Sequence, residues 1–232
     1  MALVVQKYGG SSLANAEQIL NVANRIAKTL DKDNKVVAVV SAMGDTTDRL
    51  MSLARRIAHK PDPRELDLLL STGELVSCTL TSMALRSMNH KSISLSGAQA
   101  GIRTDAQYGK AKISEIEPQR IQDELSRGNV VIVAGFQGIS DDMDVTTLGR
   151  GASDLSAVAI AASLKADRCE VYTDVEGIYT ADPKLVPEAR KLDELGYEEM
   201  LELASYGAKM HPRSIEFGMT YNVPILVASS FT

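Results

Sequence analysis

The chain of 232 residues alternates short, continuous runs of β-branched apolar residues with longer stretches in which apolar residues recur at helical spacing. The short runs predict buried strands at residues 3–6, 36–40, 92–95, 130–134, 169–172 and 225–227. The longer stretches predict helices at residues 16–30, 47–58, 65–88, 118–126, 155–164, 198–205 and 214–221. Because the strands are apolar throughout, we expect a mainly parallel sheet covered by helices on both faces.

The pattern runs without an internal repeat or a low-complexity linker, and the segments at 61–63 and 141–144 are typical of surface loops. We therefore expect a single domain, residues 1–232, with two lobes. The predicted fold class is α/β, with a mainly parallel sheet between two layers of helices. In such sheets ligands bind beyond the carboxyl ends of the strands, so the loops there are expected to carry the chemistry.

The composition argues against several classes of protein. With 44% hydrophobic and 24% charged residues, the chain has the balance of a globular protein and not of a disordered one. The net charge of −5 argues against nucleic acid as the main partner, because phosphate backbones recruit clustered lysine and arginine. We expect no signal peptide in the first residues and no membrane span, because no run approaches the roughly twenty apolar residues that a span needs.

The two cysteines, Cys78 and Cys169, form no CxxC motif, which argues against a disulfide framework or a zinc site. The three histidines form neither an HExxH motif nor a cluster, so transition-metal catalysis has little support. No GxSxG sequence is present to form a nucleophile elbow. A reducing compartment fits these residues, and we expect a cytoplasmic protein with no membrane partner.

Residues 7–12, Lys-Tyr-Gly-Gly-Ser-Ser, directly follow the first predicted strand and precede the first long helix. Paired glycines let the backbone approach a ligand closely and turn its N–H groups toward an anion, while Lys7 and the helix N-terminus add positive charge. The order is not that of a Walker A loop, in which the lysine follows the glycines. A phosphate-binding loop and an ordinary tight turn with a solvated lysine both fit this segment.

Residues 146–154, Thr-Thr-Leu-Gly-Arg-Gly-Ala-Ser-Asp, begin like a dinucleotide-binding fingerprint. Asp154 stands where the third glycine belongs, and a carboxylate there would repel a pyrophosphate, which excludes the dinucleotide interpretation. Arg150 offers a planar fork suited to a carboxylate ligand, and Asp154 is placed to orient lysines or a metal ion. The alternative is that Ser153 or Asp154 is an ordinary helix N-cap.

Three further segments carry candidate residues that also have a plain structural explanation. Glu74 follows an apolar run and could meet the ammonium group of an amino acid, or face solvent on a helix. Tyr179 and Lys184 lie in a loop after a strand and could clamp a nucleotide, although a hairpin explains the same turn. Lys209 could contact a phosphate, or lie on the surface behind a helix C-cap at Gly207.

Together these loops gather cations and carboxylates at the ends of predicted strands. The cations are Lys7, Arg150, Lys184 and Lys209, and the carboxylates are Asp154, Asp174 and Asp182. Phosphoryl transfer requires such an arrangement, because it depends on positioning and on neutralising the charge of the moving phosphoryl group. The residues by themselves therefore favour a phosphotransferase without naming its substrate.

From Val5 to Phe231 the chain also resembles the catalytic domain of the aspartokinases, a branch of the amino-acid kinase family. The segments that carry the resemblance are, in order, KYGGSS from Lys7, VVSAMGDTTD from Val39, LLSTGE ending at Glu74, GFQGI from Gly135, TTLGRGASD from Thr146, YTDVEGIYTADPKLVPEARKLDE from Tyr172 and ELASYGAKMHPRS from Glu202. The resemblance implies the three-layer α/β/α sandwich of the amino-acid kinase fold, with a mainly parallel sheet of about eight strands. It also implies ATP-dependent phosphorylation of the side-chain carboxylate of L-aspartate to 4-phospho-L-aspartate, the first step toward lysine, threonine and methionine.

The resemblance assigns roles to individual residues as well. Lys7 and Lys209 would stabilise the transferring phosphoryl group, and Asp154 would hold these lysines in place. The residues that would bind aspartate are Ser41, Thr47, Glu74, Arg150 and Ser153. The residues that would line the nucleotide site are Gly9, Gly10, Thr173, Asp174, Tyr179 and Lys184. The implied partners are L-aspartate and ATP with Mg²⁺, with no metal ligand named, and we expect a homodimer.

The implied mechanism explains why histidine is scarce. The nucleophile is a carboxylate with an ordinary pKa of about 3.9, so it is ionised at neutral pH and needs no general base. Lysines and Mg²⁺ must cancel the repulsion between this carboxylate and the triphosphate. Aspartokinases usually continue into paired ACT domains that bind lysine or threonine, whereas this chain stops at Thr232. We therefore expect no ACT domain and no inhibition by either amino acid.

The sequence departs from the aspartokinase pattern at four places. Ala152 replaces a glycine and would be strained at a positive φ. Leu75 and Ala228 replace a glutamine and an arginine. The segment at Met210 is one residue short, which would rotate the following helix by about 100° unless the loop absorbs it. Two alternatives therefore accompany aspartate phosphorylation: a kinase for another acidic substrate, and a non-catalytic partner subunit that binds nucleotide or a sister chain.

Overall fold

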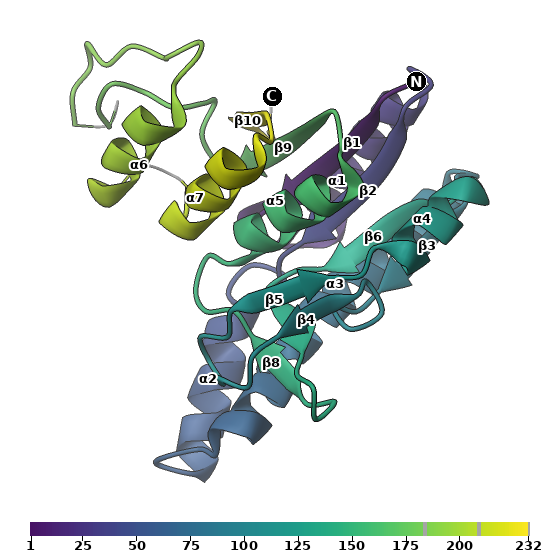
Figure 1. The fold of residues 1–232 in the computed structure, drawn as a ribbon, viewed down its shortest axis with the longest axis vertical. Coiled ribbons are helices and arrows are strands. Elements are labelled where there is room, and N and C mark those ends of the chain that lie inside the picture. Colours follow the sequence, from purple (N-terminus) through teal and green to yellow (C-terminus); the bar gives the residue numbers. More distant parts are fainter. Residues whose placement is uncertain (183–184, 208–209, 232) are drawn as a thin grey trace.

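The computed structural model describes residues 1–182, 185–207 and 210–231, and its main sheet has six parallel strands. The strand order is β10-β9-β1-β2-β6-β3, so the first strand of the chain lies near the middle of the sheet (Figure 1). These strands are β1 (Leu3–Tyr8), β2 (Lys35–Val40), β3 (Ser92–Leu95), β6 (Val130–Ala134), β9 (Arg168–Thr173) and β10 (Ile225–Ser229). All six confirm a strand that the apolar runs predict, to within two residues at either end.

Helices cover both faces of the main sheet (Figure 1). On one face lie α1 (Ala16–Leu30) and α3 (Pro63–Ser87). On the other lie α4 (Gln119–Ser126), α5 (Ser153–Leu164), α6 (Tyr197–Ser205) and α7 (Pro212–Tyr221). Alternate residues of β2 divide between two cores: Val36 and Ala38 pack beneath α1 and α3, whereas Val37 and Val39 pack against the opposite layer. The three-layer α/β/α sandwich is therefore confirmed, and it follows from strands that are apolar on both faces.

A second, smaller sheet holds four short strands that the apolar pattern does not predict. In the order β5-β4-β7-β8, it comprises β4 (Ile102–Thr104), β5 (Ile113–Ile116), β7 (Gln137–Ile139) and β8 (Val145–Thr147). Each strand is three or four residues long. Such a strand has too few apolar residues for the alternating pattern of a β-strand to be recognised in the sequence. The described residues thus contain six strands in one sheet and four in another, and not one sheet of about eight strands between the helix layers.

A third apolar cluster anchors the loop that precedes α5. Leu148, Ala152 and Leu155 are buried in this cluster together with Leu70 of α3. Leu50, from α2 (Thr46–Ile57), packs against its edge. Both flanks of the loop at residues 149–151 are therefore fixed by burial, so the side chains that follow at the start of α5 have a defined position.

Local capping chemistry sets the helix boundaries. The Asn15 side chain accepts a backbone N–H at 2.9 Å where α1 begins, and the Asp62 side chain accepts two backbone N–H groups at the start of α3. Gly207 follows α6 with φ of +101°, the left-handed conformation of a C-terminal glycine. Helix α5 begins at Ser153 without a side-chain cap, so the N-cap interpretation of Ser153 or Asp154 is wrong.

Among the described residues, α3 is the one helix long and apolar enough to cross a membrane, judged by length and composition. The expectation that no run approaches such a length is therefore wrong for α3. However, 56% of its most apolar stretch is buried inside the fold, and the helix carries the buried carboxyl groups of Asp67 and Glu74. The core helix of a globular protein passes the same test, so this result gives weak support for a membrane span.

Candidate functional site

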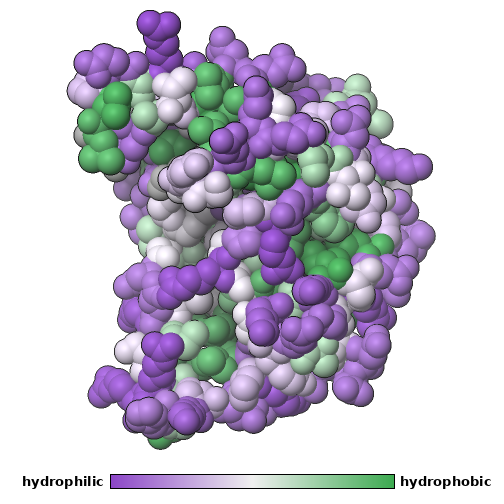
Figure 2. All heavy atoms as spheres, turned by 60° about the vertical axis from the view of Figure 1, so that its left-hand side comes forward, coloured by the Kyte–Doolittle hydropathy of each residue, from purple (hydrophilic) through white to green (hydrophobic). Residues whose placement is uncertain are grey.

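The candidate site lies where the carboxyl ends of β1, β2, β6 and β9 meet. Backbone hydrogen bonds tie the loops to these ends: Ser41 N donates to Tyr8 O at 3.1 Å, and Gly9 N donates to Tyr172 O at 3.3 Å. In Figure 2 the surface is indented between the upper part of the molecule, which carries α6 and α7, and the lower part, which carries α2. The loops expected to carry the chemistry thus form one connected group.

Lys7 and Asp154 form an ion pair between the main sheet and α5. The Lys7 Nζ atom lies 2.7 Å from Asp154 Oδ1, and the two side chains are only 12% and 9% exposed. A carboxylate in so dry a place is costly without a positive partner, and Lys7 supplies it. An ammonium group has three donors, so contact with Asp154 leaves Lys7 with capacity for an anionic ligand. The ion pair is observed, and the role of Asp154 in orienting a lysine for the reaction stays a prediction.

Packing accounts for Gly10, whereas Gly9 has room for a side chain. A Cβ atom on Gly10 would lie 2.8 Å from Ala42 O and 3.1 Å from Gly44 O, in the loop after β2. Gly44 N also donates to Gly10 O at 3.0 Å. A Cβ atom on Gly9 would meet Lys7 Nζ at 3.5 Å, which is an ordinary contact. The missing side chain at Gly10 therefore lets two strand-end loops meet, and Gly9 leaves space beside the Lys7 ammonium group.

Glu74 is a buried carboxyl group with one unpaired oxygen. Its Oε1 atom accepts a hydrogen bond from Ala42 N at 3.1 Å, whereas Oε2 has no hydrogen-bond partner within the described ranges. Glu74 is 3% exposed, so its interpretation as a solvent-facing helical glutamate is wrong. Burial raises the pKa of Glu74 to about 7. An unpaired buried carboxylate oxygen would be stabilised by a cationic group of a ligand.

Ser153, Ser41 and Thr47 come from three elements around the same strand ends. The Oγ atom of Ser153 lies 3.1 Å from the position that a Cβ atom would take on Gly135, directly after β6. Ser41 follows β2, and its carbonyl accepts a hydrogen bond from Ser77 Oγ of α3 at 2.6 Å. Thr47 lies half-buried in the first turn of α2. Their predicted role in binding a substrate stays a prediction.

Arg150 lies apart from the buried groups. Its Nη2 atom is 2.9 Å from Asp48 Oδ1 of α2, and its side chain is 89% exposed. The flanking Gly149 and Gly151 have φ angles of +93° and +72°, a conformation that favours glycine and explains the Gly-Arg-Gly order. The ion pair holds Arg150 beside the turn of α2 that carries Thr47. A contact between Arg150 and a carboxylate ligand stays a prediction.

The residues expected to line a nucleotide site begin at the ends of β1 and β9. Thr173 is the last residue of β9, and its Oγ1 atom donates to Asp174 Oδ1 at 3.1 Å. The Thr173 carbonyl accepts a hydrogen bond from Ser230 N at 2.9 Å, which ties it to the end of β10. Tyr179 lies half-buried farther along the chain, in an antiparallel bridge with Lys191. Gly9, Thr173 and Asp174 are thus close in the fold, and Tyr179 belongs to a separate segment.

Lys184 and Lys209 lie outside the described residues, so their roles stay predictions. The segment that follows Lys209 is described from Met210 onward. His211 begins α7 by accepting a hydrogen bond from Arg213 N at 3.2 Å. Its Cδ2 atom lies 3.2 Å from the position that a Cβ atom would take on Gly151. The chain after Lys209 therefore returns to the loop before α5.

The structure shows the surroundings of the residues that depart from the aspartokinase pattern. Ala152 is buried with φ of −79°, so the strain expected at a positive φ is absent. Leu75 lies on the outer face of α3. Ala228 of β10 packs against the core beneath α1, and Met210 is buried in the core on the other face. Ala152 and Leu75 therefore place no strained or polar group among the candidate residues.

Asp67 is a supporting residue that sequence reasoning missed. Its buried carboxylate accepts hydrogen bonds from Gly109 N at 2.8 Å, Thr147 N at 2.7 Å and Thr147 Oγ1 at 2.8 Å. Arg213 adds a second connection by donating to Leu148 O at 3.0 Å. These contacts fix the end of β8, directly before the loop that carries Arg150. The one available signal was a carboxylate inside an apolar helical stretch.

The part of the chain that the structure describes contains no group of three or more His, Cys, Asp or Glu side chains that could hold a metal ion. Cys78 and Cys169 are buried free thiols. Burial raises the pKa of Cys78 to about 12 and that of Cys169 further, so neither is a reactive thiolate.

A cavity of about 490 Å³ lies between residues 177–178, residues 191–197, α6, α7 and β10. Apolar residues such as Met200 and Met210 line it together with charged residues such as Lys191, Asp193 and Glu194. Neither Lys7 nor Glu74 lines it. The cavity is therefore separate from the charged groups of the candidate site.

The chain is similar to known kinases along its whole length. The model of the amino acid kinase family matches residues 2–229. An aspartokinase of Mycolicibacterium smegmatis is 56% identical over 234 residues, which cover 100% of this chain and 56% of that relative. The chain spans about half the length of the curated relatives it matches.

Two solved structures share this fold. The aspartate kinase from Synechocystis superimposes with a TM-score of 0.89 at 49% identity, covering 100% of this chain and 38% of that one. The aspartokinase III of E. coli was solved in complex with aspartate and ADP in its R-state. It superimposes with a TM-score of 0.89 at 28% identity, covering 99% of this chain and 62% of that one. The resemblance inferred from the sequence motifs is confirmed by these matches.

Proposed function

The chain belongs to the amino acid kinase family, and from this membership we propose that it transfers the γ-phosphoryl group of ATP to the side-chain carboxylate of L-aspartate. The product is 4-phospho-L-aspartate. Relatives named aspartokinase support this proposal, and so does the E. coli structure that holds aspartate and ADP.

The observation that carries the proposal is that Glu74 has an unpaired buried carboxyl oxygen and Lys7 has a nearly buried ammonium group, both near the carboxyl ends of the main sheet. Glu74 Oε2 lies beside the loop after β2, and Lys7 lies at the end of β1, the strand next to β2. Both groups thus lie at the carboxyl ends of neighbouring strands, and we propose that one small ligand contacts both of them. An amino acid with a second carboxylate matches this polarity, because its ammonium group meets Glu74 while its side chain extends toward Lys7.

The proposed chemistry needs no general base. The aspartate side chain has an ordinary pKa of about 3.9 and is ionised at neutral pH. One of its oxygens attacks the γ-phosphorus, the bond from phosphorus to the bridging oxygen breaks, and ADP leaves with the electron pair. The protein contributes by holding two anionic reactants together against their repulsion.

Lys7 is proposed to place positive charge on the phosphoryl group in transit, with Asp154 keeping its ammonium group in position. The short, nearly buried contact between them supports this assignment. Helix α5 begins at Ser153, so the positive end of its dipole adds to the same region. By the aspartokinase pattern, Lys209 is proposed as a second cation on the phosphoryl group and Lys184 as a nucleotide contact.

Aspartate is proposed to bind between α3, α2 and the start of α5. Glu74 would accept its ammonium group, and the guanidinium of Arg150 is suited to its α-carboxylate. Arg150 would exchange Asp48 for the ligand, which costs little because an exposed ion pair is weak. The remaining proposed contacts are the hydroxyl groups of Ser41, Thr47 and Ser153.

ATP is proposed to lie along the ends of β1 and β9. The proposed contacts are Gly9, Gly10, Thr173, Asp174 and Tyr179. Mg²⁺ would enter as MgATP, because this ion keeps several waters and is usually bound by substrate phosphates with one or two carboxylates. The lack of a carboxylate cage in the described ranges fits that mode, and Asp174 is the carboxylate at the end of β9. The bound Mg²⁺ would neutralise phosphate charge.

A hydroxylamine trap tests the reaction directly, because acyl phosphates form hydroxamates. We expect hydroxamate from L-aspartate with MgATP, and we expect Lys7→Ala to abolish it. Lys32→Ala, which removes an exposed lysine in the turn after α1, should retain full activity. Hydroxamate from L-glutamate or a related acid, but not from aspartate, would favour a kinase for another substrate. No hydroxamate from any acid would contradict the kinase proposal and favour a non-catalytic partner subunit.

The proposed reaction places the protein at the start of lysine, threonine and methionine biosynthesis, in the cytoplasm. The buried free thiols of Cys78 and Cys169 suit a reducing compartment. Expression in cells that lack aspartokinase activity should restore growth without these amino acids, and Lys7→Ala should not. Equal growth with both versions would contradict the assignment.

We further propose a homodimer formed through the outer face of α3. Five exposed apolar side chains share this face: Leu68, Leu75, Val76, Leu80 and Met83. Residues 68–83 contain one acidic or basic residue, Glu74. Because Glu74 is buried, the exposed face of this segment carries no charge. The exposed Thr72 and Thr79 donate their hydroxyl groups to carbonyls of their own helix. An uncharged stripe of this length supports burial against a partner, and two copies would meet without like-charge repulsion.

Light scattering of the purified chain tests the dimer. We expect twice the monomer mass for wild type and the monomer mass for Val76→Glu, which puts a charge at the centre of the stripe. Leu185→Glu alters an exposed apolar residue elsewhere and should leave the dimer intact. A monomeric wild type would contradict the proposal.

A further inference from the structure

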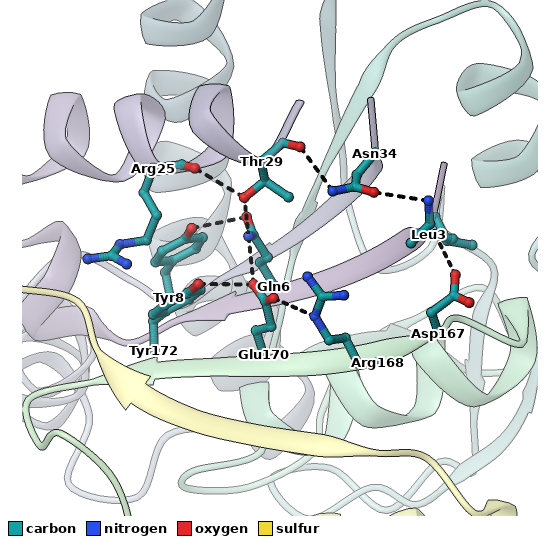
Figure 3. A network of polar contacts seen from close by, with 11 residues as sticks. Leu3, Gln6, Tyr8, Arg25, Thr29, Asn34, Asp167, Arg168, Glu170 and Tyr172 are labelled. Carbon is teal, nitrogen blue, oxygen red and sulfur yellow. Dashed lines mark hydrogen bonds and ion pairs between the residues drawn. The ribbon is translucent and has the colours of Figure 1, made fainter. Parts of the chain in front are cut away.

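A network of hydrogen-bonded side chains lies beneath α1, between that helix and strands β1 and β9 (Figure 3). Its members are Gln6, Tyr8, Arg25, Thr29, Arg168, Glu170 and Tyr172. The four side chains closest to the strand ends are buried: Gln6, Tyr8, Glu170 and Tyr172. None of them is among the residues that the motifs assign to the reaction.

Glu170 is the centre of the network. Its Oε2 atom accepts hydrogen bonds from Gln6 Nε2 at 2.8 Å and from the Tyr172 hydroxyl at 2.9 Å, and its Oε1 atom accepts one from Arg168 Nε at 2.7 Å. A buried carboxylate is costly unless it is paired and hydrogen-bonded, and these three donors meet that need. Gln6 Nε2 also donates to Thr29 Oγ1 at 3.0 Å, which ties the strands to α1.

Two stacked aromatic rings continue the network to the strand ends. The ring centres of Tyr8 and Tyr172 are 5.1 Å apart with planes inclined by 9°. The guanidinium carbon of Arg25 lies 4.7 Å from the centre of the Tyr172 ring, and the Tyr8 hydroxyl donates to Gln6 Oε1 at 3.1 Å. Burial raises the pKa of Tyr172 to about 12, so its hydroxyl stays a donor at physiological pH.

The network occupies the two strands that lead into the proposed nucleotide site. On the same face of the sheet, β2 and β6 present Val36, Ala38, Val40, Val130, Ile132 and Ala134. Tyr8 directly precedes Gly9, Tyr172 directly precedes Thr173, and Gly9 N donates to Tyr172 O. Apolar side chains would fill the space beneath α1 with no polar atoms to satisfy. The hydrogen-bonded polar residues of β1 and β9, next to the apolar residues of β2 and β6, therefore indicate a need for one fixed geometry.

Lys7 lies between two members of the network in the sequence. Side chains alternate along a strand, so Gln6 and Tyr8 are held beneath α1 while Lys7 reaches Asp154 on the other face. The strand is thus fixed from both sides at this residue. Displacement of a reacting or charge-stabilising group by about 1 Å can cost about 100-fold in rate, so the position of Lys7 is worth such reinforcement.

We propose that Glu170 and Tyr172 are positioning residues for phosphoryl transfer, which through this network hold Lys7 and the loop at residues 9–10 where the nucleotide phosphates bind. The inference rests on the proposed kinase function. Glu170 and Tyr172 are expected to affect the binding of nucleotide and not the binding of aspartate. The proposed aspartate contacts, such as Glu74, come from other elements.

Two conservative variants test the proposal. Tyr172→Phe keeps the stacked ring and removes the hydroxyl, whereas Glu170→Gln keeps the shape and removes the charge. In both we expect kcat/KM for ATP to fall about 10- to 100-fold, with KM for aspartate unchanged within about twofold. The dissociation constant of ADP, measured by calorimetry without turnover, should rise about 10-fold, the change expected for losing roughly one charge-assisted hydrogen bond. Tyr108→Phe is the matched control, because it removes a hydroxyl that donates to Asp144 outside the site.

Thermal unfolding of each variant separates positioning from folding. If both variants lower the unfolding midpoint but keep the ADP affinity and the KM for ATP of wild type, the network is structural and the proposal is wrong. If Glu170→Gln does not fold, Tyr172→Phe decides the question by the same measurements. A wild type that forms no hydroxamate overturns the kinase function, whereas unchanged ADP affinity in Tyr172→Phe overturns the positioning role.

Discussion

Lys7 Nζ lies 2.7 Å from Asp154 Oδ1, a contact that joins the end of the first strand to the first turn of α5. Because both side chains are nearly buried, water and salt screen this ion pair only weakly. The contact also explains why a carboxylate can stand where a dinucleotide fingerprint has glycine. The charge of Asp154 is neutralised within the protein before any phosphate binds.

Breaking this pair should affect both activity and stability. Lys7→Met and Asp154→Asn should each lower kcat about 10²- to 10³-fold, because a charge that stabilises the moving phosphoryl group is lost or misplaced. Lys7→Met should also lower the free energy of unfolding by about 3 kcal/mol, because Asp154 is left unpaired. Hydroxamate formation and urea unfolding measure the two effects. The double variant should lose less stability than the sum of the single losses, and strict additivity would contradict the coupling.

Glu74 should make stability depend on pH. Burial raises its pKa to about 7 from an ordinary value of 4.5, so between these values the folded protein holds a proton that the unfolded chain has released. The free energy of unfolding should therefore fall as pH rises through this window, by up to about 3 kcal/mol. Glu74→Gln should remove that dependence and exceed wild type in stability at about pH 8. Urea unfolding across the pH range measures this.

Glu74 should also make aspartate binding depend on pH. Binding should strengthen as pH rises, whereas stability should fall. An ionised Glu74 attracts the ammonium group of aspartate, so KM for aspartate should fall as pH rises from about 6 to about 8. Glu65→Gln, which alters an exposed carboxylate on the same helix, should keep both pH profiles. Parallel stability curves for wild type and Glu74→Gln would show that Glu74 does not titrate in this range.

The two adjacent glycines should respond differently to substitution. Gly10→Ala should cost about 1–3 kcal/mol of stability, because its Cβ atom would lie 2.8 Å from a backbone carbonyl oxygen of Ala42. Gly9→Ala should leave stability unchanged and raise KM for ATP, because its methyl group fills space beside Lys7. Thermal unfolding and steady-state kinetics measure both. Equal destabilisation by the two variants would contradict this difference.

Arg150 should matter for substrate and not for folding. Its pair with Asp48 is exposed, so Arg150→Ala should leave the unfolding midpoint unchanged. KM for aspartate should rise about 10- to 100-fold, the range expected for loss of a charge-assisted hydrogen bond. Asp48→Asn is the control, because it releases Arg150 without removing it. An unchanged KM in Arg150→Ala would exclude Arg150 from the aspartate site.

Asp67→Asn should destabilise the fold. The carboxylate accepts three hydrogen bonds, two of them from backbone N–H groups on one oxygen, and an amide cannot accept on both of its terminal atoms. We expect a loss of about 2–3 kcal/mol in the free energy of unfolding. Asp193→Asn, at an exposed position, should have no effect. Urea unfolding of both variants is the measurement.

The main sheet and its helices could be predicted because each element carries its own apolar pattern. The helix at 16–30 begins at a capping asparagine, and the strand at 130–134 is apolar at every position. The second sheet could not be predicted in this way, because its strands are held by contacts between distant segments. A Cβ atom on Gly138, for example, would lie 2.6 Å from Thr104 Cγ2. That close approach has no signature in either local sequence.

The candidate site likewise has features that the sequence predicts and features that it does not. The motifs identify Lys7 by the paired glycines that follow it, Asp154 by its place in the Gly-Arg-Gly-Ala-Ser-Asp segment and Glu74 by the apolar run before it. They do not reveal that Glu74 is buried with one oxygen unpaired, or that Arg150 contacts Asp48. The network around Glu170 gave no signal either, since a polar residue within a strand is by itself unremarkable.

The sequence by itself determined the fold class, the family and the ionisable residues from which a phosphoryl-transfer site is built. These properties depend on residue type and on periodicity over a few residues, which are local. Only the tertiary structure decided which charges are neutralised, which carboxyl group has a raised pKa and which strands are braced beneath α1. Electrostatic free energies depend on burial and on distances between groups, and the order of the strands sets both.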